Sequence, residues 1–163
     1  MNKLTLEAAE VLKKILYINI ASITPEGEPW NTPVYCAYDS KLNYYWLSWK
    51  DNQHSMNVRN NSKVFITSYD STALAGTGFG VYLKGEAKEL KNPKDMLIAI
   101  TEVYKREKRK PRDVAEFLKK FPRRIYKFTP SQVWVNGDAK IDGNFIDVRT
   151  ELNLDELREV INK

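Results

Sequence analysis

The sequence is poor in cysteine and histidine, with one of each among its 163 residues. The single cysteine, Cys36, excludes an intramolecular disulfide and any multi-cysteine metal centre, and the single histidine, His54, excludes a histidine-rich zinc site. We therefore predict no metal. Cys36 lies in an apolar segment, where we expect a small buried side chain. Nothing in this composition calls for an oxidising compartment, so we expect a cytoplasmic protein.

Long apolar runs are also missing. No stretch approaches the roughly 20 apolar residues of a transmembrane helix. The first residues, "MNKLTLEAAEVLKK", are charged and amphipathic and lack the apolar core of a signal peptide. Hydrophobic residues nevertheless make up 42% of the chain and aromatic residues 12%, enough for a sizeable core. Without an internal repeat or a long linker, we expect one domain over residues 1–163.

The net charge of +5 is unevenly distributed along the chain. Residues 105–127 contain eleven Lys or Arg and three acidic residues, a local charge of +8, so the rest of the chain carries about −3. Such a segment could bind nucleic acid. However, no aromatic residues alternate with the charges of "KREKRKPR", as a base-stacking surface would require. A solvated helix end and loop is therefore the favoured interpretation.

Hydrophobic periodicity predicts a mainly β protein with a few helices. We expect helices over residues 5–16, from Asn92 and Pro93, from Pro111, and after Asn153, where Glu156 completes a capping box. We expect strands over residues 17–24, 30–39, 43–49, 63–70, 81–90, 124–129, 133–137 and 144–149. Pro33 should lie at a sheet edge or bulge. Many short strands joined as a meander predict a small closed or partly closed β-barrel with peripheral helices.

The stretch "LSWKDNQHSMNVRNN", residues 47–61, concentrates hydrogen-bond donors where a strand ends and a helix begins near Asn52. The first N–H groups of a helix lack internal partners and carry partial positive charge, so a phosphate can bind there. The side chains able to add donors or charge are Ser48, Lys50, Asn52, Gln53, His54 and Ser55. The alternative is that Asn52 caps the helix while the others face water. We expect neither Ser48 nor His54 to belong to the core.

Residues 17–89 resemble the pyridoxamine 5′-phosphate oxidase-like family, the flavin-binding split β-barrels. The resemblance depends on the succession of "IASITPEGEPWNTPV", "YYWLSW", "NQHSMNVRNNSKV" and "GVYLKGEAKEL". It weakens through residues 90–123 and returns in outline at "RIYKFTPSQVWVNGD". The family implies a split barrel of six or more mostly antiparallel strands. It also implies a homodimer that binds FMN in two clefts between the subunits.

The resemblance also implies roles for individual residues. Thr32, Pro33 and Val34 would run along the isoalloxazine ring, and Leu47 and Ser48 would continue that wall. The phosphate would be held by Asn52, Gln53 and His54, with Trp49, Lys50 and Ser55 completing the candidate set. Trp134 would approach the flavin of the second subunit.

The chain departs from the family's pyridoxamine phosphate oxidases at several basic positions. Thr32, Ala37, Gln53 and His54 stand where those enzymes carry basic residues, and "VNGDAKIDGNF" lacks their C-terminal basic cluster. Vitamin B6 oxidation is therefore not expected, and fewer charges face the phosphate. Because we find one phosphate-sized donor cluster with no second one near it, we expect FMN to bind better than FAD.

These observations predict an FMN-dependent oxidoreductase that transfers hydride or electrons to a small molecule, with a reduced nicotinamide, NAD(P)H, as a candidate donor. No catalytic residue can be assigned from the sequence. The alternatives are a flavin-binding protein without turnover, a deazaflavin-dependent reductase that uses the basic segment, a nucleic-acid-binding domain, and a haem-binding relative. We expect a homodimer, because one small barrel is unlikely to bury all of its large aromatic residues: Trp30, Tyr35, Tyr44, Tyr45, Trp46, Trp49 and Trp134.

Overall fold

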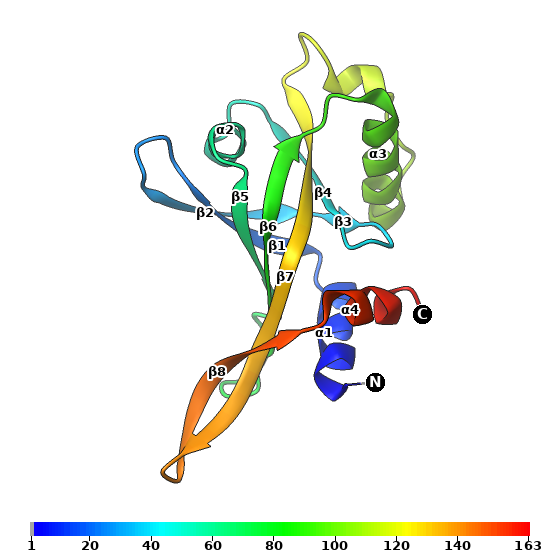
Figure 1. Ribbon diagram of the computed structural model, residues 1–163. Coiled ribbons are helices and arrows are strands. Elements are labelled where there is room, and N and C mark those ends of the chain that lie inside the picture. Colours follow the sequence, from blue (N-terminus) through cyan, green and yellow to red (C-terminus); the bar gives the residue numbers. More distant parts are fainter. Residues whose placement is uncertain (1) are drawn as a thin grey trace.

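The computed structural model describes residues 2–163, except for the side chains of Asp138 and Phe145 (Figure 1). Along the chain, the helices and strands are α1 (Lys3–Lys14), β1 (Tyr17–Ile23), β2 (Pro29–Tyr35), β3 (Ala37–Tyr38), β4 (Tyr44–Trp49), α2 (Gln53–Asn60), β5 (Lys63–Tyr69), β6 (Gly80–Glu89), α3 (Pro93–Glu107), the short 3-10 helix η1 (Val114–Phe117), β7 (Arg123–Ile141), β8 (Asn144–Leu152) and α4 (Leu154–Ile161).

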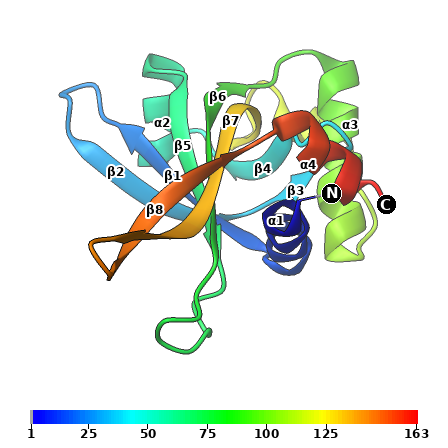
Figure 2. The ribbon, with the colours of Figure 1, turned by 60° about the horizontal axis from the view of Figure 1, so that its bottom comes forward.

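One antiparallel sheet contains all of these strands, in the order β2-β1-β5-β6-β7-β4-β3, with β8 paired to β7. Strands β2 and β3 lie at the two ends of this order, yet Cys36 alone separates them in the sequence. The sheet therefore curls back on itself (Figure 2). The predicted mainly β, split-barrel fold is confirmed. Pro33 lies in the edge strand β2, as expected of a residue that cannot donate to a ladder.

Strand β7 corrects the prediction of two separate strands at 124–129 and 133–137. It runs without a break and pairs with β4 through its first part, with β8 through its last part, and with β6 in between. Pro130 is accommodated because the register to β6 shifts at Gly85. A Cβ at Gly85 would lie 2.2 Å from the Thr129 carbonyl oxygen, so only glycine fits here.

Two apolar clusters form the core. The barrel interior is built from alternate residues of the strands, including the predicted inward set of β6: Val81, Leu83, Gly85 and Ala87. The second cluster lies between α3 and the outer face of β3, β4 and β7, with Tyr45, Ile100 and Ile125 among its members. Cys36 is buried in the first cluster, as predicted, and burial raises its pKa to about 12.

The helix ends confirm some sequence predictions and correct others. Asn92 caps α3 and Asn153 caps α4 through their side-chain oxygens. Glu156 does not complete a capping box in α4. Its carboxylate instead accepts a hydrogen bond from the backbone N–H of Asn2, at the start of α1, at 3.0 Å.

The helix predicted from Pro111 is wrong. Only η1 forms there, anchored by the buried Phe117. Pro122 disfavours the helical conformation at the residue before it, and the chain is already extended at Leu118. The result is an irregular basic connection between α3 and β7. Among the described residues, no helix combines the length and apolar character needed to cross a membrane.

Candidate functional site

A cavity of about 460 Å³ lies between β2, the end of β4 and the start of α2 on one side, and α3 with the basic connection on the other. It brings together eight of the twelve predicted site residues: Thr32, Pro33, Val34, Leu47, Ser48, Trp49, Asn52 and His54. The remaining wall consists of Tyr35, Val103, Tyr104, Glu107, Arg109, Arg112 and Arg123.

The polar end of the cavity is a hydrogen-bonded cluster of three side chains. Ser48 Oγ lies 2.7 Å from His54 Nε2, and Asn52 Nδ2 donates to Ser48 Oγ at 3.0 Å. Contrary to expectation, Ser48 and His54 are both buried, with 8% and 4% of their surface exposed. Asn52 occupies the N-cap position of α2, but its side chain makes no capping bond because it is turned to Ser48. The first N–H groups of α2 are thus left for another acceptor.

His54 contributes no charge to this cluster near neutral pH. Burial lowers its pKa below the ordinary value, so the neutral ring is favoured. A neutral imidazole can donate through one nitrogen and accept through the other. His54 therefore serves here as a hydrogen-bonding group, and any positive charge must come from elsewhere.

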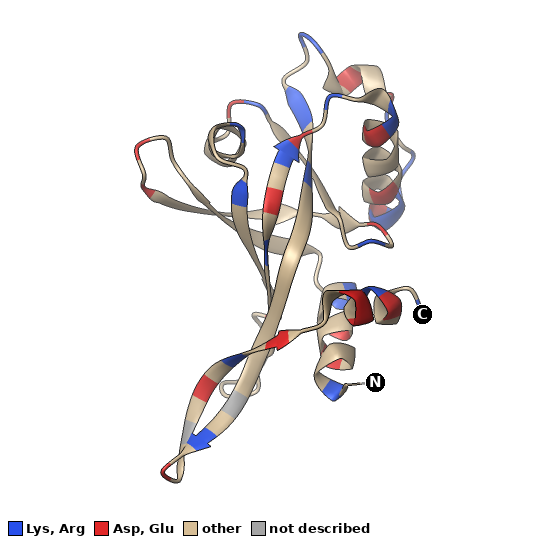
Figure 3. Cartoon of the chain, in the orientation of Figure 1, with Lys and Arg blue, Asp and Glu red and all other residues tan. Residues whose placement is uncertain are grey.

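Three arginines of the basic segment supply that charge: Arg109, Arg112 and Arg123. Figure 3 shows Lys and Arg along the connection between α3 and β7. Arg109 pairs with Glu107 at 3.7 Å and Arg112 with Glu116 at 3.2 Å. Within the described part of the chain, the Arg123 guanidinium has neither an ion pair nor a hydrogen bond. The basic segment is therefore more than a solvated loop, because part of it forms a cavity wall.

The sequence interpretation missed these arginines as site residues. They are far in sequence from residues 47–61, and all three lie within residues 90–123, where the family resemblance is weakest. One signal was present in the sequence. The positions where the family carries basic residues near the phosphate hold uncharged residues here, while residues 105–127 contain a basic run that the resemblance does not explain. Only the folded chain brings part of this basic run to the wall of the cavity.

Four predicted site residues do not line the cavity. Lys50 lies 3.9 Å from the Asp51 carboxylate, and Gln53 Nε2 donates to the side chain of Asn57, one turn along α2. Ser55 is fully buried. Trp134 stacks on Phe65, on the face formed by β5, β6 and β7. Its approach to the flavin of a second subunit stays a prediction.

A second, larger cavity of about 830 Å³ lies on another part of the sheet. Its walls include Trp30, Phe65 and Pro130. Its lining includes the buried Ser22, whose Oγ accepts a hydrogen bond from Asn57 Nδ2 at 3.0 Å. Its charged side chains are Lys63, Lys84 and Glu86. Size alone would favour this cavity, but the chemistry of the donor set favours the smaller one.

The sequence and the fold were compared with known proteins. Residues 4–137 match the family described as pyridoxamine 5′-phosphate oxidase. No curated protein matches the sequence. A heme binding protein from Mycobacterium smegmatis superposes with a TM-score of 0.68 at 13% identity, covering 98% of this chain and 61% of that protein. This chain thus spans less than two thirds of that protein.

Two further solved structures share the fold. A FAD-binding protein from Mesorhizobium loti has a TM-score of 0.61 at 18% identity, covering 83% of this chain and 94% of that one. An F420 reductase has a TM-score of 0.56 at 17% identity, covering 76% and 93%. At such identities the likeness establishes the fold.

Proposed function

The chain belongs to the pyridoxamine 5′-phosphate oxidase family, and from this premise we propose that it binds FMN in the cavity beside α2. The observation that carries the proposal is the hydrogen-bonded cluster of Ser48, Asn52 and His54 at the start of a helix, in which Ser48 and His54 are buried. The same cavity contains an apolar wall from β2 and β4, including Pro33, Val34 and Leu47. The polar end of the cavity therefore suits the phosphate of FMN, and its apolar wall suits the flat isoalloxazine ring.

Size and charge support this fit. Ligand cavities typically measure about 300–1,000 Å³, and this one measures about 460 Å³. With His54 neutral, its wall carries three arginines and one carboxylate, Glu107, a net charge of +2. A phosphate monoester carries about −1.5 to −2 at neutral pH. The arginines thus replace the basic residues that the family pattern places elsewhere.

Bound FMN would supply hydride or electron transfer, and the protein would supply binding and orientation. Ser48, Asn52 and the start of α2 would orient the phosphate, and Pro33 and Leu47 would shield the ring from water. We propose an oxidoreductase acting on a small molecule, with NAD(P)H as the candidate hydride donor. The cytoplasm is the expected compartment.

We also propose that the protein is a homodimer. Tyr44, Tyr45 and Trp46 are buried within the single chain, so fewer aromatic side chains need a partner than the sequence implied. Trp30, Trp49 and Phe65 remain exposed, and two of them line the larger cavity. Exposed apolar patches of this kind often mark interfaces. A second copy seated there would cover them.

The proposal is tested by the absorption spectrum of the purified protein and by titration with FMN, followed by flavin fluorescence. A flavin spectrum, or saturable quenching at one FMN per chain, supports the proposal. Absence of both would overturn it.

The same spectrum tests the haem alternative raised by the Mycobacterium smegmatis protein, because bound haem gives an intense Soret band. The chain's candidate ligands fit haem less well. His54 is buried and bonded to Ser48, and Cys36 is buried with a raised pKa. The arginines would also suit a deazaflavin, the alternative cofactor with a longer phosphorylated tail. Parallel titrations with the deazaflavin and with FMN show which of these two cofactors binds more tightly.

A further inference from the structure

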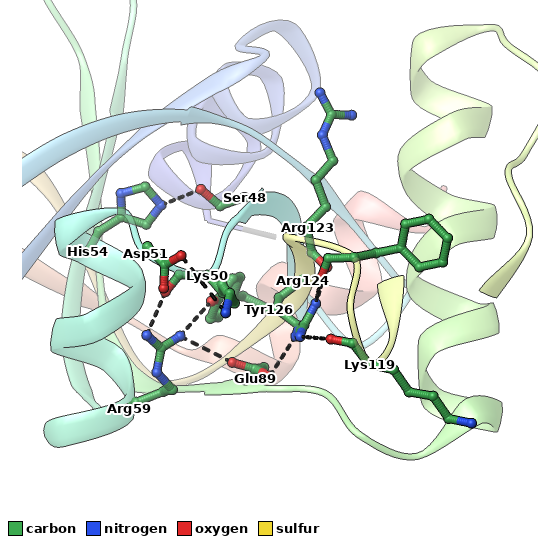
Figure 4. Close-up of polar contacts among 11 residues, drawn as sticks. Ser48, Lys50, Asp51, His54, Arg59, Glu89, Lys119, Arg123, Arg124 and Tyr126 are labelled. Atoms are coloured by element: carbon green, nitrogen blue, oxygen red, sulfur yellow. Dashed lines mark hydrogen bonds and ion pairs between the residues drawn. The ribbon is translucent and has the colours of Figure 1, made fainter. Parts of the chain in front are cut away.

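Arg123 opens β7 beside the start of α2. It is paired with Trp49 in the ladder, just as Arg124 is paired with Ser48. Because successive side chains of a strand point to opposite faces, the two arginines point apart. Arg124 faces Glu89, whereas the side chain of Arg123 points away from this carboxylate (Figure 4). Arg123 lines the cavity.

Arg124 belongs to a cluster that does not line the cavity. The Glu89 carboxylate lies 3.3 Å from Arg59 of α2 and 3.4 Å from Arg124 of β7. The side chains of Glu89 and Arg124 are only 14% and 13% exposed. Arg59 also donates to the Tyr126 hydroxyl at 3.3 Å. We call Arg59, Glu89 and Arg124 the ionic clamp.

The ionic clamp fixes the two loops that flank the start of α2 (Figure 4). Arg59 donates to the carbonyl oxygen of Lys50, in the loop between β4 and α2. Arg124 donates to the carbonyl oxygens of Lys119, Phe121 and Arg123, at the end of the basic connection. The two loops also contact directly, because Lys50 N donates to the Pro122 carbonyl oxygen at 2.9 Å. The backbone of Arg123 is thereby held next to the loop between β4 and α2.

We propose that Arg123 binds the phosphate of FMN and that Glu89 is a positioning residue that holds Arg123 in place through the ionic clamp. This inference deepens the proposed function and rests on it. Arg123 is suited to the role because its guanidinium is unpaired within the described residues, is permanently charged and can bind phosphate through two nitrogens. Glu89 acts on Arg123 indirectly. It pairs with Arg59 and Arg124, and the other hydrogen bonds of these two arginines hold the loop between β4 and α2 and the end of the basic connection.

The test compares dissociation constants for FMN and riboflavin, which differ only in the phosphate. The variants are Arg123→Gln and Glu89→Gln, with Lys110→Gln as the matched control. Lys110 lies in the same basic segment and is exposed, but it does not line the cavity. Its replacement removes one charge from the segment and leaves the cavity wall intact.

We expect the native protein to bind FMN more tightly than riboflavin. Arg123→Gln should weaken FMN binding about 10- to 100-fold, as for loss of one charged hydrogen-bonding partner, and leave riboflavin binding unchanged. Glu89→Gln should also lower the ratio of FMN affinity to riboflavin affinity. Lys110→Gln should change neither constant by more than about two-fold, since a distant exposed charge is screened by salt.

An unchanged ratio of FMN to riboflavin affinity in Arg123→Gln would overturn the role of Arg123. An equal loss for both flavins in Glu89→Gln would show that Glu89 is merely structural. If Glu89→Gln fails to fold, Arg124→Lys takes its place. It keeps the charge beside Glu89, but its single ammonium nitrogen cannot bond Glu89 and the three carbonyl oxygens together, so the ratio of FMN to riboflavin affinity must still shift. Failure of the native protein to bind either flavin would instead reject the proposed function.

Discussion

At the scale of single residues, Ser48 shows what the sequence could and could not reveal. A serine before a donor-rich loop suggested a phosphate contact, but its burial against His54 and Asn52 depends on how α2 folds back over the end of β4. The sequence pattern identifies the polar types and the helix start. The burial of Ser48 depends on elements from the whole sheet. The pattern of apolar residues within residues 47–61 therefore does not predict it.

Ser48→Ala should lower the free energy of unfolding by about 1–3 kcal/mol, because it leaves the Nε2 atom of the buried His54 without its hydrogen-bond partner. FMN affinity should fall as well. Urea unfolding and FMN titration measure the two effects. If stability is unchanged, the cluster is open to water and the burial described above is contradicted.

The single histidine gives the protein a defined pH response. Because burial lowers the pKa of His54, the folded state binds fewer protons than the unfolded state below pH of about 6.5. The free energy of unfolding should therefore fall as pH decreases from 7.5 to 5.5, by at most about 1.4 kcal/mol per unit. His54→Gln should reduce this slope, as measured by urea unfolding at each pH. If the free energy of unfolding depends equally on pH in the native protein and in His54→Gln, His54 is not the group responsible for this dependence.

At the scale of elements, regular segments were predictable and interruptions were not. The strand β6 and the capped helix α3 follow from alternation and from Asn92 with Pro93. The union of two expected strands into β7 depends on Gly85, which lies 45 residues from Pro130 in sequence and opposite it in the ladder. Likewise, the failure of the helix after Pro111 reflects a tertiary anchor, Phe117, and the restriction imposed by Pro122.

Gly85→Ala should destabilise the fold by about 1–3 kcal/mol, because the new Cβ overlaps the Thr129 carbonyl and both Phe128 and the ladder must shift. Gly143→Ala is the control: its Cβ meets nothing within 4 Å, and only its left-handed φ of 81° is strained. Thermal unfolding of both variants measures the difference. A smaller loss at Gly85 than at Gly143 would show that β6 and β7 separate readily at the bulge.

At the scale of the whole molecule, the resemblance in the sequence predicted the architecture well because the succession of strands determines the order of the sheet. It could not predict the cavity's charge. That charge depends on the basic connection after α3 returning to β4, through the clamp formed by Arg59, Glu89 and Arg124. The fold thus unites two sequence features that we interpreted separately.

Assembly is tested at this same scale. We expect light scattering at micromolar concentration to give the mass of a dimer, twice 18.9 kDa. Trp134→Ala should weaken FMN binding and leave the dimer intact, because Trp134 is expected to approach the flavin of the partner subunit. A monomer mass for the native protein contradicts the first expectation. A variant that dissociates with unchanged FMN affinity contradicts the second.

The most direct test of the account is a crystal structure of the protein grown with FMN. We predict the phosphate within hydrogen-bond distance of Asn52 and Arg123, at the start of α2, and the ring against Pro33, Val34 and Leu47. FMN bound instead in the larger cavity, between Trp30 and Phe65, or with its phosphate away from α2, would contradict the central claim.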